Sequence, residues 1–167
     1  MSSAPGRRAV VPSVDIQIQS PLWRAEPAAE ETVRAAIAAA AATLSTAGGE
    51  VAILLTDDAA IRALNRHWRG IDRATNVLSF PAAKPGAPGF LGDIVIAYET
   101  LERECDEEDH EFLHHLAHLA VHGLLHLLGF DHQQESEADA MEGLESKIMA
   151  RLQMPDPYRA RDLTRDA

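Results

Sequence analysis

The residues of this chain that are best suited to chemistry lie in one run, His122-Gly-Leu-Leu-His126-Leu-Leu-Gly129-Phe-Asp-His132. His122 and His126 are four residues apart, so on a helix both imidazoles lie on one side, about one turn apart. Gly129 can adopt a positive φ and end that helix, which lets the chain turn back and present His132. Three neutral imidazole nitrogens around one point suit a tetrahedral zinc ion whose fourth position stays open to water. The run therefore predicts a catalytic site with one zinc ion held by His122, His126 and His132.

The same histidine spacing occurs in the metzincin proteases, in which a glutamate follows the first histidine and serves as the general base. In this chain that position is Gly123. The zinc ligands are kept and the peptidase base is absent, so the run favours a substrate whose cleavage depends on charge stabilisation, such as a phosphodiester. A zinc metallopeptidase of metzincin-like spacing is the first alternative.

Other polar residues could orient the metal ligands. A histidine that binds a metal usually donates its second N–H to a carboxylate or a carbonyl. Asp93, at the start of an expected strand, is one candidate for that carboxylate, and Asp131, beside His132, is another. His118 lies one turn before His122, and we expect it to be a hydrogen-bond partner or a residue of the cleft wall rather than a fourth ligand.

A second group of residues could bind phosphate. Arg69 stands before Gly70 at the expected end of a helix, so its guanidinium can project and offer two donors to a phosphate. Arg62, Arg66 and Arg73 lie close by in the sequence and are candidates for RNA binding. The net charge of −11 is unusual for a protein that binds nucleic acid. These arginines nevertheless predict a local basic patch on an acidic chain.

Length and composition favour one compact unit. The 167 residues fit a single domain, which we expect at residues 13–154 between an N-terminal tail (1–12) and a polar C-terminal tail (155–167). No stretch approaches the ~18–20 uncharged apolar residues that a membrane span needs, so we expect no membrane association. The single cysteine, Cys105, excludes an internal disulfide and fits a reducing cytosol, so we expect a cytoplasmic location.

The hydrophobic pattern predicts the elements that must position these residues. Strands are expected at about 14–18, 51–55, 76–80 and 92–98. Helices are expected at about 27–47, 58–68, 99–107, 109–128 and 138–152. The helix with the histidines is apolar almost all round, which places it in the interior. Because strands and helices do not alternate strictly, the pattern predicts an α+β fold with a mixed sheet of about four strands and about five helices around the histidine-bearing helix.

The arginine-bearing helix has its own signals. Thr56 or Asp57 can cap its N-terminus. Ile61, Leu64 and Trp68 recur at helical spacing, so we expect all three to face inward.

Three segments (65–81, 91–98 and 116–132), in their sequence and in their order along the chain, resemble the YbeY family of bacterial rRNA maturation factors. The resemblance covers about half of the residues between 60 and 135, and it departs from the family chiefly at the termini and in the Pro/Gly-rich loop 81–90.

The resemblance implies an α+β fold with zinc held by His122, His126 and His132, and a functional arginine at Arg69. It implies a single-strand-specific endoribonuclease that acts in maturation of the 3′ end of small-subunit rRNA and in ribosome quality control. The partners would be single-stranded rRNA and the ribosome or its assembly factors, and no DNA is expected. In this hypothesis Arg69 neutralises the charge that develops on phosphorus. The second alternative is a non-catalytic ribosome-assembly factor with a structural zinc.

Overall fold

The computed structural model describes residues 10–46, 48–82, 89–131 and 133–158. Along this part of the chain the elements follow in the order β1 (Ser13–Ile18), η1 (Pro21–Ala25), α1 (Ala29–Leu44), β2 (Glu50–Thr56), α2 (Asp58–Arg69), β3 (Val77–Pro81), β4 (Phe90–Ala97), α3 (Tyr98–Glu108), α4 (Phe112–Leu127) and α5 (Glu135–Arg151). The predicted strands and helices are confirmed, and the short 3-10 helix η1 was not predicted. Of the two expected tails, residues 1–9 and 159–167 lie outside the described residues.

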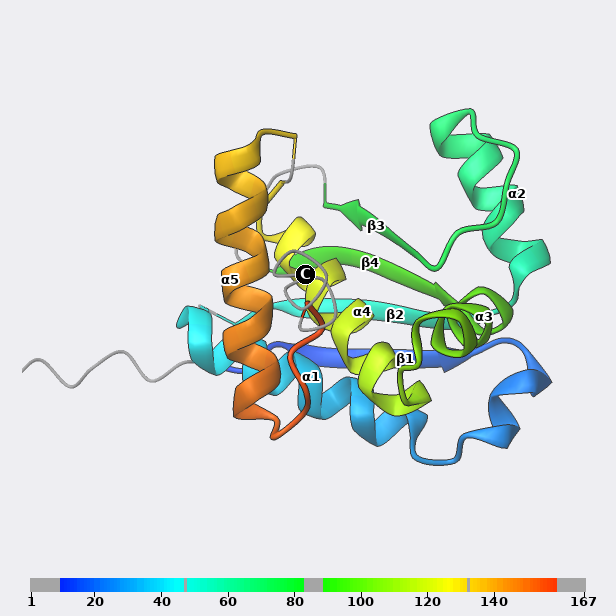
Figure 1. Cartoon of the computed structure of the whole chain (residues 1–167). Helices are drawn as coiled ribbons and strands as arrows, with labels where there is room; N and C mark the ends of the chain where they lie inside the picture. Colours follow the sequence, from blue (N-terminus) through cyan, green and yellow to red (C-terminus); the bar gives the residue numbers. More distant parts are fainter. Residues whose placement is uncertain (1–9, 47, 83–88, 132, 159–167) are drawn as a thin grey trace, which may run out of the picture.

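The four strands form one mixed sheet in the order β1-β2-β4-β3 (Figure 1). β1 and β4 both run parallel to β2, whereas β3 runs antiparallel to β4. β3 is therefore an edge strand, paired on one side only within the described part of the chain. This arrangement confirms the predicted α+β class with a mixed sheet.

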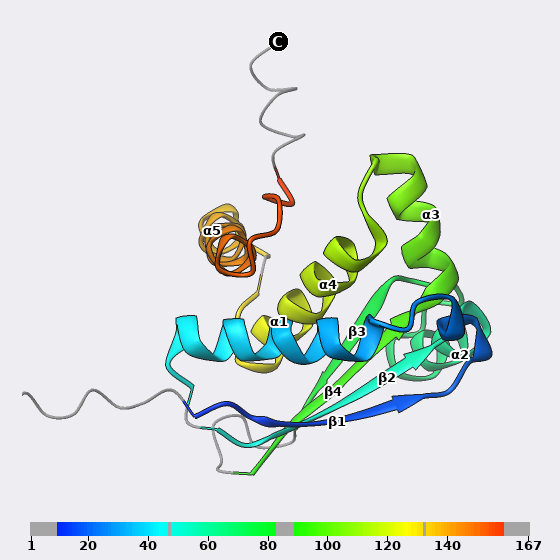
Figure 2. The same ribbon diagram turned by 90° about the horizontal axis from the view of Figure 1, so that it is seen from below.

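One face of the sheet carries the larger core and three helices. Helices α1, α4 and α5 lie on this side (Figure 2), and α4 packs against α1, α5 and the strands β3 and β4. Ile53 of β2 and Ile94 and Ile96 of β4 point into this core, where they join Leu124 of α4. The prediction that the histidine-bearing helix lies in the interior is confirmed. Within the described residues, no helix combines the length and the apolar character that crossing a membrane requires.

The opposite face of the sheet is covered by α2. Ile61 of this helix packs with Leu78, Val95 and Ala97 in a second, smaller core. Asp57 is the N-cap, because its Oδ1 accepts a hydrogen bond of 2.9 Å from the Ala60 amide.

The expectation for the last turn of α2 is wrong at one position. Leu64 packs against the smaller core, but the side chain of Trp68 is 66% exposed. Its indole ring meets Phe80 at 6.3 Å between centroids and lies beside a groove rather than beneath packed side chains. Helical spacing identified the correct face of α2, but at Trp68 a groove separates that face from the sheet.

The end of α4 follows the sequence prediction. Gly129 has a φ of +98°, which lies in the left-handed region that glycine favours. The amide of Gly129 donates to the carbonyl of His126 at 3.1 Å, and the amide of Phe130 donates to the carbonyl of Leu125 at 3.0 Å. The chain thus leaves the helix where the sequence predicts. His132 lies outside the described residues.

Candidate active site

Helix α4 presents a continuous row of imidazoles along one side. His118, His122 and His126 follow one another at four-residue intervals, so each ring lies about one turn from the next. The ring centroids are 6.2 Å apart between His118 and His122 and 4.5 Å apart between His122 and His126. All three side chains are half-buried, so this side of α4 remains accessible from a cleft.

His122 and His126 converge on one point. Their Nε2 atoms lie 3.0 Å from each other. Two nitrogens bound to one tetrahedral zinc ion at 2.0–2.1 Å would lie about 3.4 Å apart, so a small adjustment would let both rings share an ion. These two donors therefore fit one shared zinc ion.

Glu145 of α5 controls the orientation of His122. Its Oε1 lies 2.8 Å from His122 Nδ1, and its Oε2 contacts His118 Nε2 and accepts a hydrogen bond from the Tyr158 hydroxyl. The Glu145 side chain is only 1% exposed. An ionised carboxylate only accepts hydrogen bonds, so His122 must carry its proton on Nδ1. The lone pair of neutral His122 is then on Nε2, the atom that faces His126.

The charge of Glu145 is maintained by these contacts. Burial by itself would raise the pKa of this carboxyl group, but the hydrogen bonds from His118 and His122 outweigh burial and lower the pKa to about 2. Glu145 is thus an anion at neutral pH, as required of a carboxylate that orients a metal-binding histidine.

Sequence reasoning missed Glu145. The only available signal is its position in α5, where Met141, Glu145 and Ile148 recur at helical spacing and are all buried. A carboxylate inside an apolar stripe needs a charged or hydrogen-bonding partner. The sequence alone does not show that this partner is His122 on another helix.

A second possible metal-binding group overlaps the first. One ligand atom from each of His118, His122 and Glu145 lies within 4.8 Å of the others, so this group could hold a metal ion. It would use Glu145 as a ligand instead of as the hydrogen-bond acceptor for His122. The two arrangements share His122 and place the ion on opposite sides of its ring.

A cleft of about 620 Å³ connects the histidines to the arginine predicted to bind phosphate. His122, His126 and Arg69 all line this cleft, together with Ser79 of β3 and Asp131. Arg69 Nη2 donates a hydrogen bond of 2.9 Å to the carbonyl oxygen of Ser79, which fixes the guanidinium against the edge strand. The structure thus brings together four of the residues singled out in the sequence, Arg69 of α2, His122 and His126 of α4, and Asp131 just beyond α4.

Gly123 lies on the side of α4 that faces the sheet. A Cβ atom at this position would lie 2.8 Å from Cγ2 of Ile94, which is closer than real Cβ contacts. The Gly123 carbonyl also accepts a hydrogen bond of 3.2 Å from Ser79 Oγ, which ties α4 to β3. A larger side chain at position 123 would therefore require Ile94 of β4 to shift.

The remaining candidates are more scattered. Asp93 lies on β4 next to Ile94, and because successive strand residues face opposite sides, it points away from α4 into a groove beside α2. The structure therefore does not bring Asp93 to the histidines. Arg62 is exposed and forms an ion pair of 2.9 Å with Asp72, and Arg66 and Arg73 are exposed at the surface near it.

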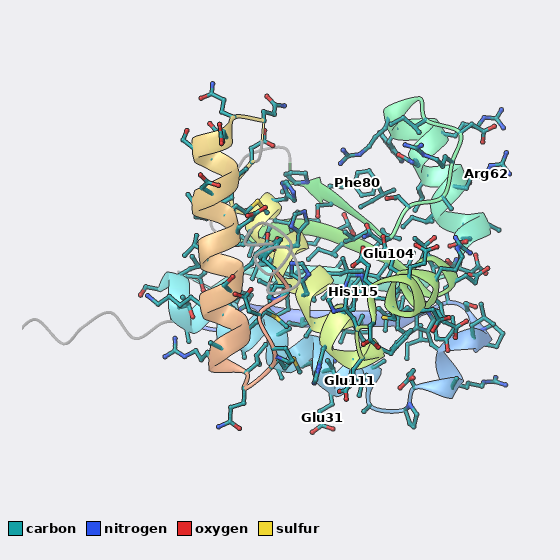
Figure 3. All side chains as sticks on the ribbon, in the orientation of Figure 1. Glu31, Arg62, Phe80, Glu104, Glu111 and His115 are labelled. Carbon is teal, nitrogen blue, oxygen red and sulfur yellow. The ribbon has the colours of Figure 1, made fainter. Side chains whose placement is uncertain are left out.

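The other histidines near α4 have carboxylate partners. His115 Nε2 lies 2.9 Å from Glu104 of α3, and Figure 3 shows these two side chains close together. His114 lies 3.2 Å from Glu111. His110 lies at the same distance from Glu108.

Comparison with known proteins gives one consistent family. The family model described as endoribonuclease YbeY matches residues 16–153. A protein named endoribonuclease YbeY from Rhodopseudomonas palustris (strain BisA53) is 54% identical, over 92% of this chain and 94% of its own. One of the same name from Bradyrhizobium sp. (strain BTAi1) is 51% identical, over 91% of this chain and 95% of its own. A solution structure of a Thermotoga maritima protein has a TM-score of 0.54 at 21% identity, covers 86% of this chain and 97% of that one, and supports the fold.

Proposed function

The chain belongs to the YbeY family of endoribonucleases, and we propose that it cleaves single-stranded RNA with one zinc ion held by His122, His126 and His132. Its membership confirms the resemblance seen in the sequence and makes the protein an endoribonuclease. The metal, the ligand set and the substrate strand are our proposal.

The observation that carries the proposal is the position of three side chains in one cleft. The Nε2 atoms of His122 and His126 face each other at 3.0 Å, and Arg69 lines the same cleft. A metal-binding pair beside a fixed guanidinium is suited to a phosphodiester, whose transition state gains negative charge on the phosphoryl oxygens.

Each residue has a distinct task in this proposal. Zinc, when bound, supplies a Lewis acid and lowers the pKa of a coordinated water to about 7. Glu145 holds the proton of His122 on Nδ1, so that Nε2 stays available in the cleft. Arg69 uses one N–H donor on the Ser79 carbonyl, and its other donors can bind the phosphate that is cleaved.

The biological substrate follows from the family resemblance. We propose that the protein acts in maturation of the 3′ end of small-subunit rRNA and in ribosome quality control, with the ribosome or its assembly factors as partners. A cytoplasmic location accords with an rRNA substrate. Arg69 lines the cleft, and Arg66, one turn earlier on α2, is exposed.

The two alternatives differ in what the cleft does. A metallopeptidase of metzincin type needs a glutamate after the first histidine, but this position is Gly123, where any side chain would force Ile94 to shift. A structural zinc site would have four protein ligands and no need for an arginine on the cleft wall. Both observations favour the nuclease.

The experiment is cleavage of a defined RNA by purified protein, stripped of metal and then reloaded with zinc. We expect the reloaded protein to cut a single-stranded RNA, the stripped protein to be inactive, and a perfect duplex to resist. The cut ends identify the attacking group, because a 2′,3′-cyclic phosphate would indicate the ribose 2′-OH. Absence of RNA cleavage by zinc-loaded protein, with rRNA maturation in cells still supported by His126→Ala, would overturn the proposal.

A further inference from the structure

A groove of about 880 Å³ lies on the opposite side of β3 from the histidine cleft. We call it the Trp68 groove, and its wall includes Leu54, Leu64, Trp68, Phe80, Phe90 and Asp93. It lies between α2 and the face of the sheet that α2 covers only in part, and Figure 3 shows the Phe80 side chain in this region.

The groove exposes aromatic surface to an unusual extent. Trp68 is 66% exposed and Phe90 is 45% exposed. The Trp68 and His67 rings are nearly perpendicular at 4.8 Å between centroids, and most of the Trp68 side chain remains accessible at its 66% exposure. Large exposed aromatic side chains that line a hollow are typical of binding surfaces.

The Trp68 groove adjoins the histidine cleft. Arg69, Ser79 and Pro81 line both hollows, so only the edge strand β3 separates them. Arg69 directly follows Trp68 in the last turn of α2. A flexible chain held at Arg69 can therefore reach both hollows by crossing the free edge of β3.

The charged side chains near the two hollows indicate where the phosphate and the base of a nucleotide would bind. Arg66 and Arg69, on the last turns of α2, form no ion pair within the described part of the chain and can attract a phosphate backbone. The Asp93 carboxylate inside the groove disfavours a phosphate there. An uncharged, flat group is the part of a nucleotide that suits a hollow lined by Trp68, Phe80 and Phe90.

We propose that the Trp68 groove binds one nucleobase of the single-stranded RNA substrate, stacked on Trp68, next to the nucleotide whose phosphate meets Arg69. This inference rests on the proposed function, since it concerns the same substrate at the same cleft. A stacked base must be unpaired, so the groove would also contribute to the preference for single strands.

The decisive experiment combines changes in the protein with changes in the RNA. In short RNAs, each nucleotide around the cut site is replaced in turn by an abasic one, and cleavage is measured with zinc-loaded protein. We expect one flanking abasic position to raise KM roughly tenfold for the unchanged protein, with kcat little affected. Trp68→Ala should raise KM by a similar factor on intact RNA and abolish the effect of that abasic position. Trp68→Phe, which keeps a ring, should recover part of the affinity.

A matched control comes from the next exposed apolar residue. Ile71 is 43% exposed and does not line the groove, so Ile71→Ala should leave KM unchanged. If the wild-type protein cleaves RNA but every abasic position changes KM equally for the wild-type protein and for Trp68→Ala, the inference is overturned. The nuclease proposal would still stand. The groove would then be open to another occupant, such as an apolar segment of a protein partner.

A binding readout separates this inference from the catalytic proposal. The chain has two tryptophans, and Trp23 is 2% exposed, so base stacking would quench mainly the fluorescence of Trp68. In a stopped-flow titration, intact RNA should quench the emission and a fully abasic oligonucleotide should not. Quenching without any cleavage would support base binding in the Trp68 groove and refute the catalytic proposal. Equal signals from both oligonucleotides would refute base binding in the groove.

Discussion

Helix α4 carries histidines near both of its ends, and the two groups have different surroundings. At the N-terminal end, His114 and His115 each lie beside a carboxylate at 3.2 Å and 2.9 Å. At the other end, His122 and His126 face each other at 3.0 Å in a cleft that also contains Arg69. Spacing on the helix therefore makes a histidine available, and the element opposite it determines which partner it binds.

The elements opposite the two ends explain the contrast. Glu104 of α3 covers the N-terminal end and gives His115 an acceptor. Glu145 of α5 covers the middle and takes only the Nδ1 side of His122, so the Nε2 side stays open toward the cleft. His118 stands at the boundary, because it contacts Glu145 and lies 6.2 Å from His122 between ring centroids.

The largest effect is expected from a histidine at the cleft end. His126→Ala removes one of two converging nitrogens, so we expect loss of bound zinc and a fall in RNA cleavage of at least about 1,000-fold. Metal content by mass spectrometry and cleavage rate measure the two effects. His114→Ala, at the other end, should keep both within about twofold. Equal losses in the two variants would remove the distinction between the ends.

The second-largest effect is expected from Arg69. Arg69→Ala leaves the histidines intact, so zinc content should be unchanged while kcat falls about 100-fold, the usual cost of losing one transition-state donor. Arg103 of α3, which is paired with Asp58 at 2.9 Å, provides the control, and Arg103→Ala should cleave normally. Loss of zinc in Arg69→Ala would show that the arginine acts on the metal site instead of on the substrate.

The carboxylates of the two ends give a third, smaller contrast. Glu145→Gln weakens the orientation of His122, and we expect zinc affinity to fall about 10–100-fold. Glu104→Gln changes the partner of His115 and should leave zinc affinity unaltered. A competition titration with a zinc chelator measures both. If Glu145→Gln binds zinc as tightly as the unchanged protein, Glu145 does not position the site.

The smallest effect concerns stability at the N-terminal end. Burial would raise the pKa of Glu104, but hydrogen bonds from His115 and Asn76 lower it below its ordinary value of 4.5. A lowered pKa means that ionised Glu104 stabilises the fold above its ordinary pKa and that this contribution is lost as pH falls through the lowered value.

Thermal unfolding between about pH 6 and 3 tests this contribution. As the pH falls, the free energy of unfolding should decrease more for the wild-type protein than for Glu104→Gln. The difference should be at most about 1 kcal/mol because Glu104 is partly exposed. Parallel curves for the two proteins would contradict the role assigned to Glu104.

The sequence predicts what depends on local rules. The four-residue spacing of the histidines, the helix end at Gly129 and the cap at Asp57 all follow from short-range geometry, and the structure has each of them. The mixed sheet also follows, since clear periodicities identify the strands and helices and these do not alternate strictly.

The sequence does not predict what depends on which faces meet. Strand alternation puts Asp93 and Ile94 on opposite faces, but only the fold shows that Ile94 is the one beneath α4. Trp68 is exposed for a similar reason, since helix periodicity cannot show that a groove lies between this end of α2 and the sheet. Glu145 is 23 residues from His122 and on another helix, so their contact is invisible to local patterns.

The position of the bound metal tests the proposed zinc site most directly. Crystals of zinc-loaded protein, measured at the zinc absorption edge, would give an anomalous-difference peak at the ion. We predict one peak about 2.0–2.1 Å from Nε2 of both His122 and His126, with Glu145 still bound to His122 Nδ1. A peak on the other side of the His122 ring, between His118, Nδ1 of His122 and Glu145, would contradict this prediction.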